Sequence, residues 1–154
     1  MDEFEMKTFT LDEAQALLPV LEALLKRAMD GKKAAESIEG RLQELARKIF
    51  LSGGLFVDIA SVRRQRASLE SHVQAAKDSV AEIDAIGVQV KDLDTGLLDF
   101  PCQIDGIIVL LCWRMGEGRI EYWHTVEDGF RGRKLIDEHF KGRKTKKPKP
   151  EQPN

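Results

Sequence analysis

A heptad pattern runs through the first half of the chain and limits the folds open to it. Apolar or small residues alternate four and three positions apart, the spacing of a helix that packs along a second helix. The spacing restarts after the short segment SGGLF, so the two helices must fold back on each other. We therefore predict a long antiparallel, coiled-coil-like helical hairpin from about residue 11 to residue 86. The seam residues are Leu17, Leu21, Leu24, Ala28, Gly31, Ala35, Ile38, Leu42, Leu45 and Ile49, then Ile59, Val62, Arg66, Leu69, Val73, Ala76, Val80 and Ile83.

Three positions of the hairpin carry further expectations. Thr10, followed three residues later by Glu13, is a capping box and marks the start of the first helix. Pro19 lacks a backbone donor, which predicts a kink, or a short first helix followed by a long one with the proline in its first turn. Arg66 is charged yet lies in the second seam, near Glu44 after fold-back. A polar seam residue more often fixes register than binds a ligand, so we expect Arg66 to set the register.

From Gly87 onward, glycine, proline and β-branched residues replace the helix formers. We predict strands in LLDFPCQ, GIIVLLCW and RIEYWH, and a short edge strand in GVQVK. Asp105 and Gly106 suit a tight turn, which pairs Ile104 with Ile107. The predicted fold class is therefore α+β. The hairpin is followed by a small three- to four-stranded antiparallel sheet at about residues 88–125, in one domain that spans residues 1–140.

A four-residue turn at Met115 to Gly118 would then set the third strand, pairing Val109 with His124. This register puts His124 in one row with Cys102, two strands away. The separation is roughly 10 Å by strand spacing, too far for a nucleophile and its base.

The opposite face of the sheet is too apolar to stay in water, and we expect the C-terminal segment GFRGRKLIDEHF or a second subunit to cover it. Asp99 and Glu121 flank Cys112 on this face. Two such carboxylates could hold a water molecule, but no sugar-binding aromatic platform accompanies them, so we do not favour a hydrolase site.

The chain has 154 residues and a net charge of −2, the size of one globular domain. It has no apolar run long enough to cross a bilayer, and its N-terminus MDEFEMKTF is acidic where a secretory signal would be basic. We therefore expect a cytoplasmic protein without membrane contact. Cys102 and Cys112 lack the spacing of a zinc or redox motif. The expected register points them to opposite faces of the sheet, which argues against a disulfide between them. We therefore expect two buried thiols.

Basic residues gather in two places. Residues 141–150, KGRKTKKPKP, hold six basic residues and no acid, and we expect residues 141–154 to be a disordered tail. The tail is either an electrostatic handle for nucleic acid or another polyanion, or a solubilising terminus. Fold-back of the hairpin gathers a second basic group at its loop, which is either a phosphate-binding tip or a solvated face without stacking aromatics. The candidates for polyanion binding are Arg47, Lys48, Arg63, Arg64, Lys144, Lys146 and Lys147.

The acidic segment VKDLDTGLLDFP precedes the first long strand. Asp92, Asp94 and Gly96 have a spacing reminiscent of a calcium loop, but the glycine is misplaced and the flanks are not two helices. Aspartates at alternate positions also suit a reversal of the chain, because their carboxylates accept hydrogen bonds from N–H groups two residues on. We favour the turn. If a metal binds, the donors that we expect are Asp92, Asp94, Glu117 and His124.

Three strings of this sequence, FTLDEAQALLPVL, GVQVKDLDTGLLDFP and LLCWRMGEGRIEYWHTVEDGFRGRKLI, resemble a bacterial family called domain of unknown function 2203. The resemblance covers about residues 7 to 136. It implies a helical hairpin followed by a small sheet, and it transfers no activity. It does suggest where to look for a ligand, although these residues are also typical of core positions and ion pairs. The candidates for ligand binding are Asp92, Asp94, Arg114, Glu117, Trp123, His124, Arg131 and Arg133.

The sequence thus supports two hypotheses of function. The first is a non-catalytic binding or assembly module, a homo-oligomer with a dimer favoured, which engages nucleic acid or another polyanion through its tail. The second is an enzyme or a metal- or ligand-binding protein with a site built from the KDLDTG segment and the strand that contains Trp123 and His124. The sequence has no phosphate-cradling glycine loop, no serine elbow and no paired-histidine motif, so we favour the first hypothesis and expect no cofactor.

Overall fold

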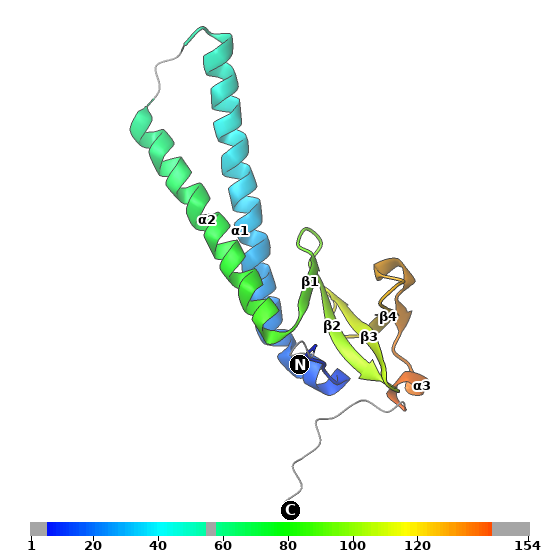
Figure 1. Ribbon diagram of the computed structural model, residues 1–154. Helices are drawn as coiled ribbons and strands as arrows, with labels where there is room; N and C mark the ends of the chain where they lie inside the picture. Colours follow the sequence, from blue (N-terminus) through cyan, green and yellow to red (C-terminus); the bar gives the residue numbers. More distant parts are fainter. Residues whose placement is uncertain (1–5, 55–57, 143–154) are drawn as a thin grey trace, which may run out of the picture. The chain divides into compact units, whose positions relative to one another are not determined.

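The computed structural model describes residues 6–54 and 58–142. Two long helices come first and five antiparallel strands follow in the order β1-β2-β3-β4-β5 (Figure 1), which confirms the α+β class. The sheet has one strand more than the three to four expected. The elements are α1 (Leu11–Leu51), α2 (Ile59–Ile86), β1 (Gln89–Asp92), β2 (Leu97–Ile104), β3 (Ile107–Arg114), β4 (Tyr122–Thr125), η1 (Phe130–Gly132), β5 (Lys134–Leu135) and α3 (Glu138–Lys141).

The chain forms two compact units. The helical unit contains Leu24–Glu82, and the sheet unit contains the start of α1 together with the chain from Ile83 onward. Among the described residues, no helix is both long enough and apolar enough to span a membrane. Residues 143–154, which include Lys144, Lys146 and Lys147 of the expected tail, lie outside the described residues.

In the helical unit, α1 follows the predicted seam. Four seam residues of α1, from Ala28 to Ile38, are buried, and the next three toward the loop are half-buried. The two helices touch at Gly31, where an added Cβ would lie 2.9 Å from the carbonyl oxygen of His72. Toward the loop the helices diverge (Figure 1). The hairpin is therefore well packed at Gly31 and only partly closed near its loop.

One expectation about the hairpin is wrong, and one of two alternatives at Pro19 is excluded. Arg66 is exposed, and the half-buried Gln65 lies inward at that heptad step. An uncharged amide costs less to desolvate than a guanidinium, which favours this rotation of the helix. Of the two alternatives at Pro19, the split into two helices is absent, because α1 runs unbroken from Leu11 to Leu51 with the proline inside it. The kink stays a prediction.

Helix α2 ends at a glycine that turns the chain into the sheet. Gly87 has a φ of 103°, a conformation that residues with a Cβ rarely adopt. The N–H of Gly87 donates to the carbonyl of Asp84, and the N–H of Val88 donates to that of Ile83. These bonds satisfy the last carbonyls of the helix and place β1 three residues after its end.

The central pair of strands has the predicted register. Ile104 lies opposite Ile107, and the ladder continues to Leu98 opposite Trp113. Asp105 and Gly106 form the turn with positive φ angles of 50° and 80°. The turn residues Asp105 and Gly106 were thus enough to predict the register of β2 and β3, which together contain sixteen residues.

The register between β3 and β4 differs by one residue from the prediction. Val109 lies opposite Thr125, and His124 lies opposite Leu110. The expected four-residue turn does not form, since residues 115–121 join the two strands. Within this connection the N–H of Ile120 donates to Oε1 of Gln15 in α1. A slip of one residue moves every side chain of β4 to the other face of the sheet. His124 therefore faces away from Cys102.

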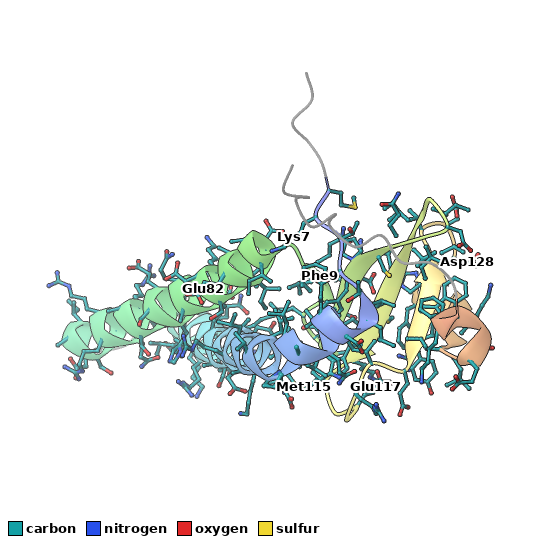
Figure 2. All side chains as sticks on the ribbon, turned by 90° about the horizontal axis from the view of Figure 1, so that it is seen from below. Lys7, Phe9, Glu82, Met115, Glu117 and Asp128 are labelled. Carbon is teal, nitrogen blue, oxygen red and sulfur yellow. The ribbon has the colours of Figure 1, made fainter. Side chains whose placement is uncertain are left out.

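Each face of the sheet meets other residues of the sheet unit. The face with Phe100 meets the residues that lead into α1. The ring of Phe9, labelled in Figure 2, meets that of Phe100 edge-on at 5.9 Å. The N–H of Phe9 donates to the carbonyl of Pro101. The other face meets the C-terminal segment, where Arg133 stacks over Tyr122. The expected segment GFRGRKLIDEHF thus contacts the second face through Arg133, whereas its Phe140 packs against Trp123 on the first face.

Candidate functional site

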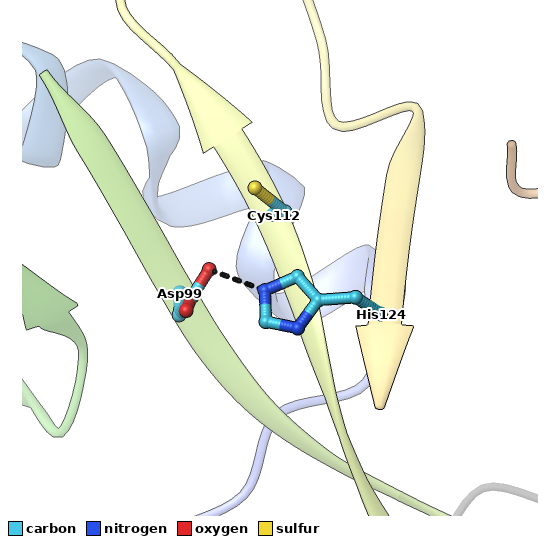
Figure 3. A group of neighbouring side chains, drawn as sticks. All are labelled: Asp99, Cys112 and His124. Carbon is cyan, nitrogen blue, oxygen red and sulfur yellow. Dashed lines mark hydrogen bonds and ion pairs between the residues drawn. The ribbon is translucent and has the colours of Figure 1, made fainter. Parts of the chain in front are cut away.

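Three buried polar side chains from adjacent strands meet on the second face of the sheet (Figure 3). Asp99 of β2, Cys112 of β3 and His124 of β4 are 3%, 1% and 2% exposed. Asp99 lies directly opposite Cys112 in the ladder. One carboxylate oxygen, the sulfur and one ring nitrogen all lie within 4.8 Å of one another. We refer to these three residues as the polar cluster.

Both ring nitrogens of His124 have oxygen partners. Nδ1 lies 2.8 Å from the backbone carbonyl of Thr125, and Nε2 lies 3.2 Å from Oδ1 of Asp99. A carbonyl oxygen only accepts hydrogen bonds, so Nδ1 carries a hydrogen and donates it. The ring is thereby held with Nε2 directed at Asp99, and one proton completes the bond between Nε2 and Oδ1.

The thiol of Cys112 is held in its neutral form. Burial raises its pKa to about 12, the charge of Asp99 acts in the same direction, and contact with Arg133 partly opposes both. Because the thiolate is the nucleophilic form, this cysteine is not activated for attack at neutral pH. His124 already has oxygen partners at both nitrogens, so the cluster is not arranged as a nucleophile and its base.

An ion pair lies beside the cluster. The Arg133 guanidinium donates to both carboxylate oxygens of Glu117, at 3.3 and 3.0 Å. It also stacks over the rings of Tyr122 and Phe130, at 3.9 and 4.4 Å from their centres. Burial alone would lower the pKa of Arg133, but the hydrogen bonds and charge of Glu117 raise it overall. The pair ties the C-terminal segment to the loop after β3.

The acidic segment that precedes β2 is a turn in the structure. Oδ1 of Asp92 accepts hydrogen bonds from the N–H groups of Asp94 and Thr95, at 2.8 and 3.4 Å. Gly96 closes the turn with a φ of 77° and donates to the carbonyl of Asp92. The favoured interpretation is confirmed, although the turn joins two strands and not a helix to a strand.

The other ligand-binding candidates are spread over several places. Arg114 is exposed and donates its N–H to Glu117, whereas Arg131 is exposed in η1. Trp123 lies on the face opposite His124, where its ring is 5.2 Å from that of Phe140. Of the eight candidates, the structure joins Glu117 directly to Arg133 through their side chains.

Sequence reasoning missed Asp99 and Cys112 as partners of His124. The predicted ladder did place Asp99 opposite Cys112, but the one-residue error in β4 turned His124 away from both. The available signal was an aspartate in the otherwise largely apolar strand LLDFPCQ, because a buried carboxylate requires a partner.

A cavity of about 720 Å³ lies elsewhere in the sheet unit, among the start of α1, the residues before β4 and α3. Its lining mixes apolar and charged groups and contains no member of the polar cluster. The lining includes Gln15, Arg119, Glu121, Leu135, Phe140 and Lys141.

The loop end of the helical unit combines exposed apolar and basic side chains. Phe50, Leu51 and Ile59 are 84%, 67% and 64% exposed, and we call these three residues the apolar tip. The basic candidates on the two helices nearby are all exposed, and one of them, Arg47, donates to both carboxylate oxygens of Glu44 at 3.2 Å. These basic residues are Arg47, Lys48, Arg63 and Arg64.

Comparisons with known proteins give a family and no function. No curated protein and no solved structure matched this chain. Residues 7–136 matched one protein family, described as "Uncharacterized conserved protein (DUF2203)". The matched residues include the long helices α1 and α2, all five strands and the polar cluster. The chain therefore belongs to the DUF2203 family of conserved proteins.

Proposed function

We propose that this protein is a non-catalytic assembly module and that the loop half of its helical hairpin pairs with the same region of a second copy. The observation that carries the proposal is the burial gradient along the hairpin. Seam residues near Gly31 are buried, those toward the loop are half-buried, and the apolar tip is exposed.

The half-buried residues continue the seam and do not form a separate patch. Leu42, Leu45 and Ile49 of α1 share this state with Val62 and Leu69 of α2. Burying a leucine or isoleucine side chain fully contributes about 1.5–3 kcal/mol. Two diverging helices leave part of that contribution unrealised, and a second hairpin would complete a four-helix bundle.

Charge on the outer faces is compatible with a second copy as the occupant. Lys26 pairs with Asp30, and Arg47 pairs with Glu44, each within one helix. A face that carries both signs can meet its own copy about a two-fold axis without strong repulsion. A strongly single-signed face would instead favour a partner of opposite charge.

Two free buried cysteines support a reducing compartment as the setting, and we propose the bacterial cytoplasm. The exposed basic residues beside the apolar tip support a secondary contact between the assembled module and nucleic acid or another polyanion. The salt dependence of that contact separates it from the apolar assembly, which high salt does not weaken.

The experiment is light scattering after size-exclusion chromatography on the full chain, with the double variant Phe50→Lys, Ile59→Asp. This change leaves the net charge unaltered. The molar mass measured for the wild type should be twice the 17.4 kDa of the monomer, and that of the variant should equal the monomer mass.

The matched control is Val126→Lys with Ile107→Asp, two residues of the sheet unit that are 58% and 66% exposed. It should remain dimeric, because these residues lie outside the hairpin. A wild type that is monomeric at every concentration would refute the proposal. So would a dimer that dissociates only in the control variant.

A further inference from the structure

We propose that Asp99, Cys112 and His124 form a binding site for one Zn²⁺ ion. The proposal does not depend on the assembly of the hairpin. A carboxylate oxygen, a thiolate sulfur and an imidazole nitrogen are all zinc ligands, and a mixed set of this kind suits zinc better than magnesium or calcium.

The spacing of the donor atoms fits a single small ion. The three ligand atoms already lie within 4.8 Å of one another. Zinc bonds of about 2.0–2.3 Å in a tetrahedron put ligand atoms roughly 3.5 Å apart. A cation can therefore enter after small side-chain rotations, with the ladder between β2 and β3 unchanged.

The histidine is already held in a metal-binding tautomer. Nδ1 donates to the backbone carbonyl of Thr125, so Nε2 is the nitrogen left to bind a metal. Histidine ligands in metal sites usually make this second bond, which fixes the ring and increases the basicity of the ligating nitrogen. Nε2 is directed at Asp99, and Figure 3 shows Cys112 on the strand between the two.

Charge balance also favours a divalent cation. With Asp99 and Cys112 both ionised and His124 neutral, the three ligands offset the two charges of Zn²⁺. The cation takes the place of the proton between Nε2 and Oδ1 and of the thiol proton of Cys112, and both protons pass to solvent. The nearby positive charge of Arg133 is offset by its bonds to Glu117.

Three protein ligands leave a fourth zinc position. Within the described part of the chain, the group consists of these three residues alone. A water molecule is the usual fourth ligand when a protein supplies three, so the site would hold Zn²⁺ with one exchangeable position.

Titration with Co²⁺ tests the site, because this ion replaces zinc and is coloured. The probe is CoCl₂ added to the full chain after chelator treatment. We expect one equivalent of Co²⁺ to bind, with a thiolate-to-cobalt charge-transfer band and the visible bands of tetrahedral cobalt. Added ZnCl₂ should remove both signals, and it should also raise the melting temperature of the protein.

Two cysteine variants form a matched pair. Cys112→Ser should abolish the charge-transfer band and weaken Co²⁺ binding by at least about tenfold. Cys102→Ser changes an equally buried thiol on the opposite face and should bind as the wild type does. Circular dichroism checks that each variant is folded.

The wild type alone can overturn the proposal. A folded wild type that takes up no stoichiometric Co²⁺ or Zn²⁺ would do so without any variant. Binding that Cys112→Ser leaves unchanged would also overturn it.

Discussion

The helical unit and the sheet unit differ most in the polar side chains that they bury. In the described part of the helical unit the buried polar side chain is Ser79, and the three residues of the apolar tip are exposed. The sheet unit also exposes apolar side chains, such as Ile107 and Val126, but it buries the carboxylate of Asp99 and the imidazole of His124 in the polar cluster. Exposed apolar and buried polar groups are the informative departures from ordinary burial. We therefore propose assembly for the helices and ligand binding for the sheet.

The largest expected effect concerns the polar cluster. Replacing His124 by Leu in metal-free protein leaves the carboxylate of Asp99 buried without its imidazole partner. We expect the free energy of unfolding to fall by about 3–5 kcal/mol. The double variant Asp99→Leu, His124→Leu removes both partners and should lie within about 1 kcal/mol of the wild type. Urea denaturation measures both. If the double variant is as unstable as His124→Leu, the loss of stability does not come from leaving the carboxylate of Asp99 unpaired.

The second largest effect concerns the contact between α1 and α2 at Gly31. Alanine at Gly31 would put a Cβ 2.9 Å from the carbonyl of His72 and 3.3 Å from the Cβ of Ala76. The helices must then separate, at a cost of about 1–3 kcal/mol. Alanine at Gly40, where nothing lies within 4 Å, should instead stabilise by about 0.5–1 kcal/mol. Thermal melts of the two variants should shift in opposite directions, and equal shifts would mean that the helices do not meet at Gly31.

The smallest effect is a pH dependence that belongs to the sheet unit. Burial raises the pKa of Cys102 from 9.0 to about 11 and that of Cys112 to about 12. Above pH 9 the unfolded chain loses thiol protons that the folded chain keeps. The contribution of the two thiols to the free energy of unfolding is therefore fully present below pH 9 and is lost as the pH rises to about 12. A Cys102→Ala, Cys112→Ala variant should lose less stability in this window. Urea midpoints on both sides of pH 9 measure the difference, and equal losses would contradict it.

The two units also differ in how far sequence predicts them. The helix bounds and the α1 seam follow from periodicity and capping, which are local. The turn at Asp105 and Gly106 fixes the ladder between β2 and β3 for the same reason. Where neighbours in sequence decide the structure, the prediction succeeded.

Prediction failed where distant residues decide. In the segment before β4, where the register was mispredicted, Ile120 makes a hydrogen bond with Gln15, 105 residues away in the sequence. No local pattern encodes it, and the error hid the polar cluster. Arg66 was misplaced because the heptad count alone does not weigh the desolvation of its guanidinium.

We propose that the loop half of the hairpin is the interface between two copies. Hydrogen–deuterium exchange of the full chain at one dilute and one high protein concentration tests this proposal. Amide protection should increase with concentration in Leu42–Leu51 and Ile59–Leu69 and stay constant in β2 and β3. Identical protection of the hairpin at both concentrations, or a change confined to the sheet, would refute the proposed interface.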